Sequence, residues 1–349
     1  MPTSIFDLVR ADELTSYWNE RTQDMPPYLG EELFPADKKL GLKLEWIKGA
    51  KGLPVVLKPS AFDVGVIPRP RMAFDKLETS MPFFKESTYI DEELRQELNM
   101  VLETGNQEYI NAVLRRVFDD EMVLLDGARA RREQMRMMAL TTGAISISAN
   151  GQAYSYDYGI PDSHKVDATV SWANTSTSDP IEDLRVWQDK IEDDTGVRPT
   201  RGILSRKSWG YMRKNDKILK SIFVLSNGQV NGISDTRLAQ YLMDELQLEL
   251  TIYGKRYTAD DGSQASFMPD DTVVLFPSGN LGKTWFGTTP EESDLMGGRA
   301  ANVSITDVGV AVTTMEKTDP VNVETKVSMI ALPSFEMAEQ VLIADITPA

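Results

Sequence analysis

The segment RREQMRMMALTTGAI, residues 131–145, joins two regular patterns and decides how the neighbouring chain folds. Before this segment, apolar residues recur every three or four positions, which is the period of an α-helix. After it, the period changes to two, which is the period of a β-strand. Gly143 separates the two patterns, and glycine is the residue that most often follows the last turn of a helix. The segment therefore predicts a helix that ends at about residue 141 and a strand that follows at once.

The helical pattern extends back to Asp91, a residue type suited to a helix N-cap. A helix over 91–141 would be ~70 Å long at 1.5 Å per residue, about twice the diameter of a small domain. We interpret it as a spine, with two ordinary core helices as the alternative. Gly105 and Gly127 lie inside it, so a bend or break is expected at either. Its apolar face comprises Leu94, Leu98, Val101, Leu102, Tyr109, Val113, Val117, Met122, Leu125 and Leu140.

A β-hairpin is predicted after the spine. Ile145 and Ile147 alternate with serines, and Tyr154 and Tyr156 alternate in the same way further on. Between them stands Asn150-Gly151, a dipeptide typical of a two-residue hairpin turn. Residues 160–178 are polar and turn-rich, which is typical of a boundary.

A mixed α/β domain is predicted over 179–300. Its first helix begins at Asp179-Pro180 and ends at Gly196, with an N-cap followed by proline at the first helical position. Further helices are predicted over 205–212, 218–225 and 235–246, and strands over 201–204, 248–253 and 272–276. From Asn302 to Ile346 the chain is again strand-rich.

The first 80 residues have a different character. Residues 1–41 are too few and too polar for a core, so we interpret them as an arm that lies on another surface. Leu44 and Trp46 alternate with charged residues, and a return strand is predicted around Met72, Phe74 and Leu77. Several prolines lie between the two strands, and prolines favour edges and loops. Residues 42–80 therefore resemble a long projecting hairpin, with an irregular surface loop as the alternative.

Composition excludes several classes of protein. The 349 residues carry a formal charge of −16, whereas a protein that grips phosphate backbones by neutralising them should be basic. The absence of cysteine excludes disulfides, thiolate nucleophiles and Cys-ligated metals. No signal peptide and no apolar run long enough to span a bilayer is evident, so we expect a soluble intracellular protein that contacts no membrane.

Candidate catalytic and binding motifs have simpler interpretations. Gly282-Lys283-Thr284 lacks the first glycine of a phosphate-binding loop, because Pro277 stands there, so we interpret it as a glycine-rich turn. His164 is the only histidine, which excludes multi-histidine metal sites, and its polar surroundings predict an exposed loop residue. Two carboxylates at a suitable separation could catalyse glycoside hydrolysis. The adjacent carboxylates of this chain lie beside glycine or proline, which is more typical of solvated turns: Asp193-Asp194, Asp260-Asp261 and Asp270-Asp271. No cofactor and no metal are expected.

The order of parts is more informative than any motif: arm, projecting hairpin, spine helix, β-hairpin, inserted α/β domain and a return to strands. This order resembles the major capsid proteins of tailed bacteriophages, in particular the lambda-like major head protein E family with its Hong Kong 97-type fold. Residues 131–145 look like that family's junction between spine helix and sheet, and Pro70-Arg71 to Phe84 is similar to its return strand.

The resemblance implies an α+β subunit with four parts. These are an N-terminal arm over 1–41, an extended β-hairpin loop over 42–80, a peripheral domain over 81–178 and 301–349 containing the spine helix, and an axial α/β domain over 179–300. It further implies a virion protein without enzymatic activity, assembled in the host cytoplasm. Its expected partners are copies of itself in hexamers and pentamers, a separate scaffolding protein, a portal, a decoration protein, and packaged double-stranded DNA bound without sequence specificity.

Two groups of residues are predicted to contact neighbouring subunits. The extended loop would bury six apolar residues in the shell: Trp46, Val55, Leu57, Phe62, Val66 and Phe74. Arginines near the end of the spine helix would pair with acidic surfaces of neighbours: Arg129, Arg131, Arg132 and Arg136. Attraction to the helix macrodipole is the simpler explanation for these cations. Two alternatives stay open, namely an α/β hydrolase that uses paired carboxylates and another self-assembling virion or encapsulin-like shell protein.

Overall fold

The computed structural model describes residues 8–23, 25–47, 76–90, 92–104, 106–223, 232–259, 261–295, 301–318 and 321–348. The chain divides into two compact units, and each is drawn from three stretches of sequence. Unit 1 comprises Met1–Glu45, Glu78–Met135 and Lys283–Ser334, and unit 2 comprises Trp46–Leu77, Arg136–Gly282 and Phe335–Ala349. These units do not coincide with the predicted peripheral and axial segments, so that finer division stays a prediction.

The predicted spine is two helices. Helix α4 covers Glu92–Thr104 and α5 covers Gln107–Thr142, and α5 runs on through Gly127; Gly105 itself lies outside the described residues. The Asn106 side chain accepts a hydrogen bond from the Glu108 N–H at 3.1 Å, which caps the start of α5. The apolar face also differs from the prediction, because Tyr109 is exposed and Ile110 is buried instead.

The junction after the spine is as predicted. Gly143 has φ +76° and its N–H donates to Ala139 O at 3.0 Å, so it ends α5 in the left-handed conformation. Strands β5 (Ala144–Ala149) and β6 (Gln152–Asp157) then pair antiparallel. The turn between them has φ +51° at Asn150 and +73° at Gly151, as a type I′ turn requires.

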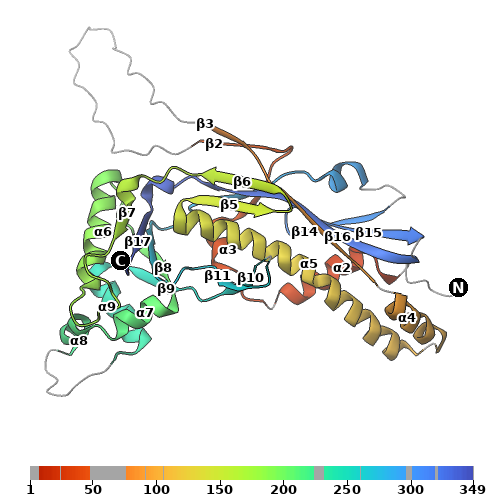
Figure 1. Ribbon diagram of the computed structural model, residues 1–349, viewed down its shortest axis with the longest axis horizontal. Helices are drawn as coiled ribbons and strands as arrows, with labels where there is room; N and C mark the ends of the chain where they lie inside the picture. The colour runs from red at the N-terminus through yellow and green to blue at the C-terminus, as the bar shows by residue number, and fades with distance from the viewer. Residues whose placement is uncertain are drawn as a thin grey trace, which may run out of the picture. The chain divides into compact units, whose positions relative to one another are not determined.

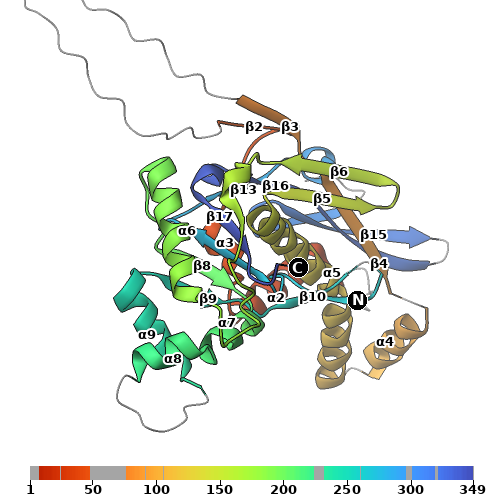
Figure 2. The same cartoon turned by 60° about the vertical axis from the view of Figure 1, so that its left-hand side comes forward.

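Unit 1 is built on a six-stranded sheet in the order β1-β13-β16-β15-β14, with β4 also paired to β16. The long strand β16 (Val321–Phe335) pairs antiparallel with β15 (Val310–Thr318), which pairs with β14 (Asn302–Thr306). Figures 1 and 2 show α5 running alongside these strands. The remaining strands are β1 (Ala36–Lys38), β4 (Phe83–Tyr89) and β13 (Gly282–Phe286), and the short helical turn η2 covers Glu291–Leu295.

The N-terminal segment belongs to unit 1. Helix α2 (Ala11–Thr22) buries Leu14 and Trp18, and its Thr15 hydroxyl lies 2.9 Å from that of Ser304 on β14. The N–H of Ala11 donates to the Asn302 side chain, also at 2.9 Å. A short helix, α3 (Leu29–Leu33), follows. The surface on which this part of the predicted arm lies is therefore the sheet of its own unit.

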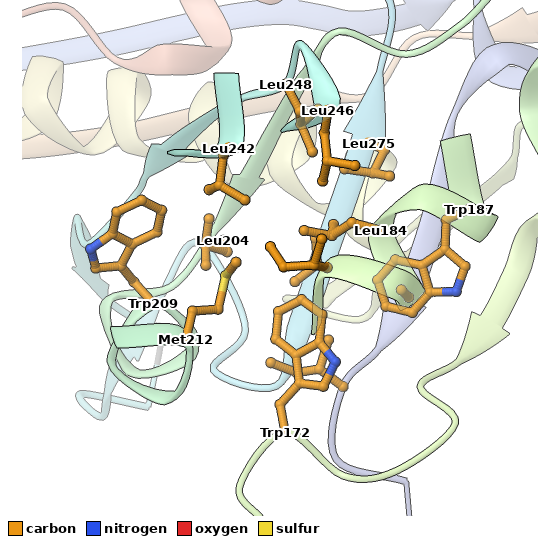
Figure 3. Close-up of a cluster of buried hydrophobic side chains, with 14 of the residues drawn as sticks. Trp172, Leu184, Trp187, Leu204, Trp209, Met212, Leu242, Leu246, Leu248 and Leu275 are labelled. Atoms are coloured by element: carbon orange, nitrogen blue, oxygen red, sulfur yellow. The ribbon is translucent and has the colours of Figure 1, made fainter. Parts of the chain in front are cut away.

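Unit 2 contains a mixed five-stranded sheet in the order β7-β17-β12-β8-β9. Helices α6 to α9 lie around it (Figure 1), and they pack on the sheet through one apolar cluster (Figure 3) that includes Trp172, Trp187 and Trp209. The predicted helices and strands of this region are present, although α8 begins and ends earlier than predicted and residues 224–225 lie outside the described residues. They are α6 (Pro180–Thr195), α7 (Arg206–Arg213), α8 (Asp216–Ile222), α9 (Asp235–Leu246), β8 (Arg201–Leu204), β9 (Glu249–Ile252) and β12 (Thr272–Phe276).

Two further strands of this sheet come from outside the predicted axial segment. Strand β17 (Leu342–Asp345) pairs antiparallel with β12 and parallel with β7 (Lys165–Asp167). Such pairings join segments more than sixty residues apart, which no local period reports. The small elements of unit 2 are the strands β10 (Arg256–Thr258) and β11 (Gln264–Ser266) and the 3₁₀ turns η1 (Asp162–His164) and η3 (Ala338–Gln340).

Replacing Gly202 should destabilise unit 2. A Cβ atom at this position of β8 would lie 2.7 Å from Leu250 Cδ2 and 2.8 Å from Val274 O, and the backbone oxygen cannot move without disturbing β12. We expect Gly202→Ala to lower the free energy of unfolding by about 1–3 kcal/mol in urea titrations. Gly254→Ala is the control, because a Cβ there meets nothing within 4 Å. Equal stability of the two variants would contradict the packing argument.

Candidate assembly surfaces

The base of the predicted extended loop is present as a separate hairpin. Strand β2 (Lys43–Ile47) pairs with β3 (Lys76–Ser80) in a two-stranded sheet. Among the predicted loop contacts, Trp46 belongs to β2. The other five lie outside the described residues: Val55, Leu57, Phe62, Val66 and Phe74.

Arg129 binds the N-terminal segment of its own subunit. Its guanidinium donates to both carboxylate oxygens of Glu31 on α3, at 2.9 and 3.1 Å. It also lies over the Tyr28 ring, 4.9 Å from the ring centroid. The hydrogen bond to Glu31 raises the pKa of Arg129. A forked pair of this kind has defined geometry, so it fixes α3 against α5.

The other predicted arginines also have partners within the subunit. Arg132 is buried, forms an ion pair with Asp307 and lies over the Phe286 ring. Arg131 donates to Gln134 at 2.6 Å, and Arg136 is only 2% exposed. Pairing of these arginines with neighbouring subunits stays a prediction. Arg129 and Arg132 attach distant segments of the same chain to α5.

Glu133 is a functional side chain that the sequence analysis missed. It is fully buried on α5, and its carboxylate accepts a hydrogen bond from the N–H of Gly30 at 3.1 Å. Gly30 lies in the first turn of α3, where unpaired N–H groups favour an anion. Glu133 and Arg129 thus both bind α3, through the consecutive residues Gly30 and Glu31. No local signal marked Glu133, because its partner lies about a hundred residues away.

The prediction that His164 is exposed is wrong. The side chain is 3% exposed, and its Nε2 lies 3.0 Å from Asp194 Oδ2 at the end of α6. The turn η1 that carries it packs against β17 and β7. A polar local sequence was therefore buried by strands that come from elsewhere in the chain.

The segment Gly282-Lys283-Thr284 is not a turn but the start of β13. Its backbone N–H groups are engaged, since Thr284 N donates to Pro35 O at 2.9 Å and Lys283 N donates to the Ser334 hydroxyl at 3.2 Å. The Lys283 ammonium lies 2.6 Å from the Asp37 carboxylate. Strand pairing of this kind leaves no loop of N–H groups that could surround a phosphate.

Three of the paired carboxylates bind other groups in the part of the chain that the structure describes. Asp194 binds His164, Asp271 pairs with Lys207 at 3.1 Å, and Asp261 accepts a hydrogen bond from Ser263 N in its own turn. Asp260 lies outside the described residues. Within the parts of the chain that the structure describes, no three acidic or histidine side chains gather as metal ligands. Likewise, no helix in those parts has the length and apolar character needed to cross a membrane.

Comparisons by sequence family and by structure both match this chain to proteins of phages or prophages. A family model described as phage major capsid protein E matches residues 10–346. The structure is similar to a protein described as the capsid protein of a prophage in E. coli CFT073, with TM-score 0.60, 17% identity, and coverage of 97% of this chain and 99% of the other. It is also similar to a phage-related protein from Bordetella bronchiseptica RB50, with TM-score 0.56, 15% identity and 97% coverage of both chains. No curated protein matches by sequence.

Proposed function

Because the chain belongs to the phage major capsid protein E family, it is a shell-forming structural protein of the virion, and we propose that it builds its shell from hexamers and pentamers linked by extended loops. The predicted α+β fold of the Hong Kong 97 type is confirmed, and the hydrolase alternative is not favoured, since the family is structural and not enzymatic. Self-association follows from membership of this family.

The β2–β3 hairpin is the observation that carries the proposal. Two strands that pair only with each other among the described residues are marginally stable in water. They gain stability when another surface covers them. Leu44 of β2 is already fully buried within its own subunit, so we propose that the next subunit covers the rest of the hairpin and buries the predicted loop contacts: Trp46, Val55, Leu57, Phe62, Val66 and Phe74.

Exposed apolar side chains of unit 1 support association. Tyr89, Met100, Tyr109 and Val123 are each about two-thirds exposed. A single exposed apolar residue is ordinary, but several on α4, α5 and the adjacent end of β4 favour burial against a second copy. The four arginines of α5 would contribute to such an interface by pairing with a neighbour's acidic groups in addition to their contacts within the subunit.

We assign the parts of the shell subunit as follows. Residues 1–41 act as the arm, 42–80 as the extended loop, 81–178 with 301–349 as the peripheral domain, and 179–300 as the axial domain. Assembly takes place in the host cytoplasm with a scaffolding protein, a portal and a decoration protein as partners. The net charge of −16 suits a shell to which the packaged DNA must not adhere, because negative charges on the inner surface of the shell would repel the DNA phosphates.

Electron microscopy and sedimentation velocity of the purified full-length protein, expressed with and without neighbouring phage genes, test the proposal. We expect icosahedral shells, tubes or hexameric capsomers. Capsomers of six or five subunits should sediment as discrete species, because ring closure permits only certain subunit numbers. A chain that stays monomeric at ~39 kDa beside its scaffold would contradict assembly through this chain's own surfaces.

A further inference from the structure

Glu121 occupies an unusual position on α5. It lies four residues after Val117 and four before Leu125, so all three side chains share one face of the helix. This face is buried, and Glu121 is itself only 4% exposed. Glutamate is almost never buried to this extent unless it is paired.

The carboxyl group of Glu121 has no adequate partner. Both of its oxygens are buried without a hydrogen bond in the part of the chain that the structure describes, and the same holds for the hydroxyl of Thr325 on β16. That hydroxyl lies close enough to favour the ionised carboxylate, but no hydrogen bond of ordinary geometry joins the two groups. A buried charge in this position is therefore poorly compensated.

Charges on the helices do not neutralise Glu121. The charge that acts on Glu121 is the carboxylate of Asp120, which repels a second negative charge. Asp119, one residue earlier, already binds Tyr17 and Arg21 of α2. The cation that α2 supplies is thus committed to another carboxylate.

Charges on the strands do not neutralise it either. The register places Thr325 beside Thr314 of β15 and Thr88 of β4 on one face of the sheet. The charged residues next along this face are carboxylates, Glu316 and Glu86, and both are exposed.

The lysine next to Thr325 points the other way. Strand residues alternate between faces, so Lys326 lies on the opposite face, where it pairs with Glu291 at 2.7 Å. Burial is the main reason that the pKa of Glu121 is raised to about 7; the Thr325 hydroxyl opposes this rise and Asp120 adds to it. Both protonation states are therefore accessible near neutral pH.

We propose that Glu121 is a proton-controlled latch between α5 and β16. When protonated, the neutral carboxyl stays buried against Thr325 and α5 is held closely on the sheet. When ionised, the carboxylate draws water into the contact, and α5 opens more readily around residues 117–125. The latch acts within unit 1 and does not depend on how subunits assemble. A shell would repeat it in every subunit, so one change of pH would act on all copies together.

The sign of the effect follows from linkage. Glu121 binds a proton more tightly in the folded chain than in the unfolded chain, where the pKa of its carboxyl is near 4.5. The stabilisation is thus fully present below pH 4.5 and is lost as the pH rises through about 7. If local opening exposes the Glu121 carboxyl completely, the equilibrium constant for opening should increase roughly 10- to 30-fold between pH 5.5 and pH 8.

Amide hydrogen exchange of the full-length protein, corrected for intrinsic rates, measures this opening. In the wild type, we expect the opening equilibrium constant of residues 117–125 and 322–328 to be larger at pH 8 than at pH 5.5 by that factor. Glu121→Gln should remove the pH dependence and keep both segments protected. Asp120→Asn removes the same charge from the adjacent exposed position, and it should keep the pH dependence.

A second variant covers the case in which Glu121→Gln does not fold. Thr325→Val removes the hydroxyl that favours the ionised carboxylate, so the pKa of the buried Glu121 should rise and the pH at which opening reaches its plateau should move upward. The proposal is overturned if Glu121→Gln keeps the wild-type pH dependence, if the wild type shows none, or if Thr325→Val moves the transition downward. None of these outcomes depends on shell formation, so the latch and the proposed assembly can fail separately.

Discussion

Deleting residues 49–68 should leave a folded, soluble chain that no longer builds stable shells. The deletion lies inside the predicted extended loop and leaves the described elements of both units intact, including β2 and β3. It removes Val55, Leu57, Phe62 and Val66, which we propose are buried on the next subunit. A shell depends on many contacts of ~1,000–2,000 Å², so loss of one contact per subunit is repeated across the lattice.

Electron microscopy with sedimentation velocity measures this outcome, and thermal unfolding shows whether the subunit still folds. A matched variant replaces residues 49–68 with a Gly/Ser linker of the same length. It keeps the chain length of the loop but lacks the apolar side chains, so it should fail to assemble as well. Intact shells from the deletion would refute the role of the loop. Shells from the linker variant alone would refute the named contacts.

Replacing Glu291 should strongly destabilise unit 1. Glu291 is 5% exposed in η2, and its two oxygens bind Lys326 at 2.7 Å and Ser328 at 2.9 Å on β16. Glu291→Ala leaves a largely buried ammonium without its counter-ion. Breaking a buried pair from one side is costly, so we expect a loss of about 3 kcal/mol in urea unfolding.

A matched control for Glu291 lies in the same unit. Asp37 pairs with Lys283 at 2.6 Å, but both side chains are about 40% exposed, so Asp37→Asn should cost less than about 1 kcal/mol. Equal losses from the two variants would show that burial does not set the cost.

The contribution of Glu291 should also depend on pH. Burial alone would raise the pKa of Glu291, but the hydrogen bonds from Lys326 and Ser328 outweigh burial and lower it. Its contribution to stability is therefore present above the unfolded value near 4.5 and is lost as the pH falls through the lowered value. This dependence is opposite in sign to that of Glu121, so the two carboxyls can be distinguished in the same pH titration.

Local signals predicted most individual elements correctly. The end of α5 at Gly143, the turn at Asn150-Gly151 and the bounds of β8 each depend on residues that are neighbours in sequence. Capping, turn conformation and side-chain period act within a few residues, so a single sequence contains them. The inserted α/β region was predicted for the same reason.

Predictions failed where burial was decided at long range. His164 has a polar local sequence but is covered by η1 packing on β17 and β7, and Tyr109 has the spacing of a core residue but is exposed. The candidate assembly residues divide in the same way. Five of the six loop contacts lie outside the described residues, while Arg129 and Arg132 have partners that no spacing could identify.

The sequence by itself determined the family, most of the helices and strands, and the absence of cysteine chemistry and of multi-histidine sites, because patterns and composition need no partner. Only the tertiary structure decided which distant segments meet: Glu31 with Arg129, Glu291 with Lys326, and Glu121 with Thr325. Many different surfaces could bury an apolar face or pair with a charged one. Strand register and close packing select one of them, and that selection sets whether a carboxyl is paired, exposed or left alone in the core.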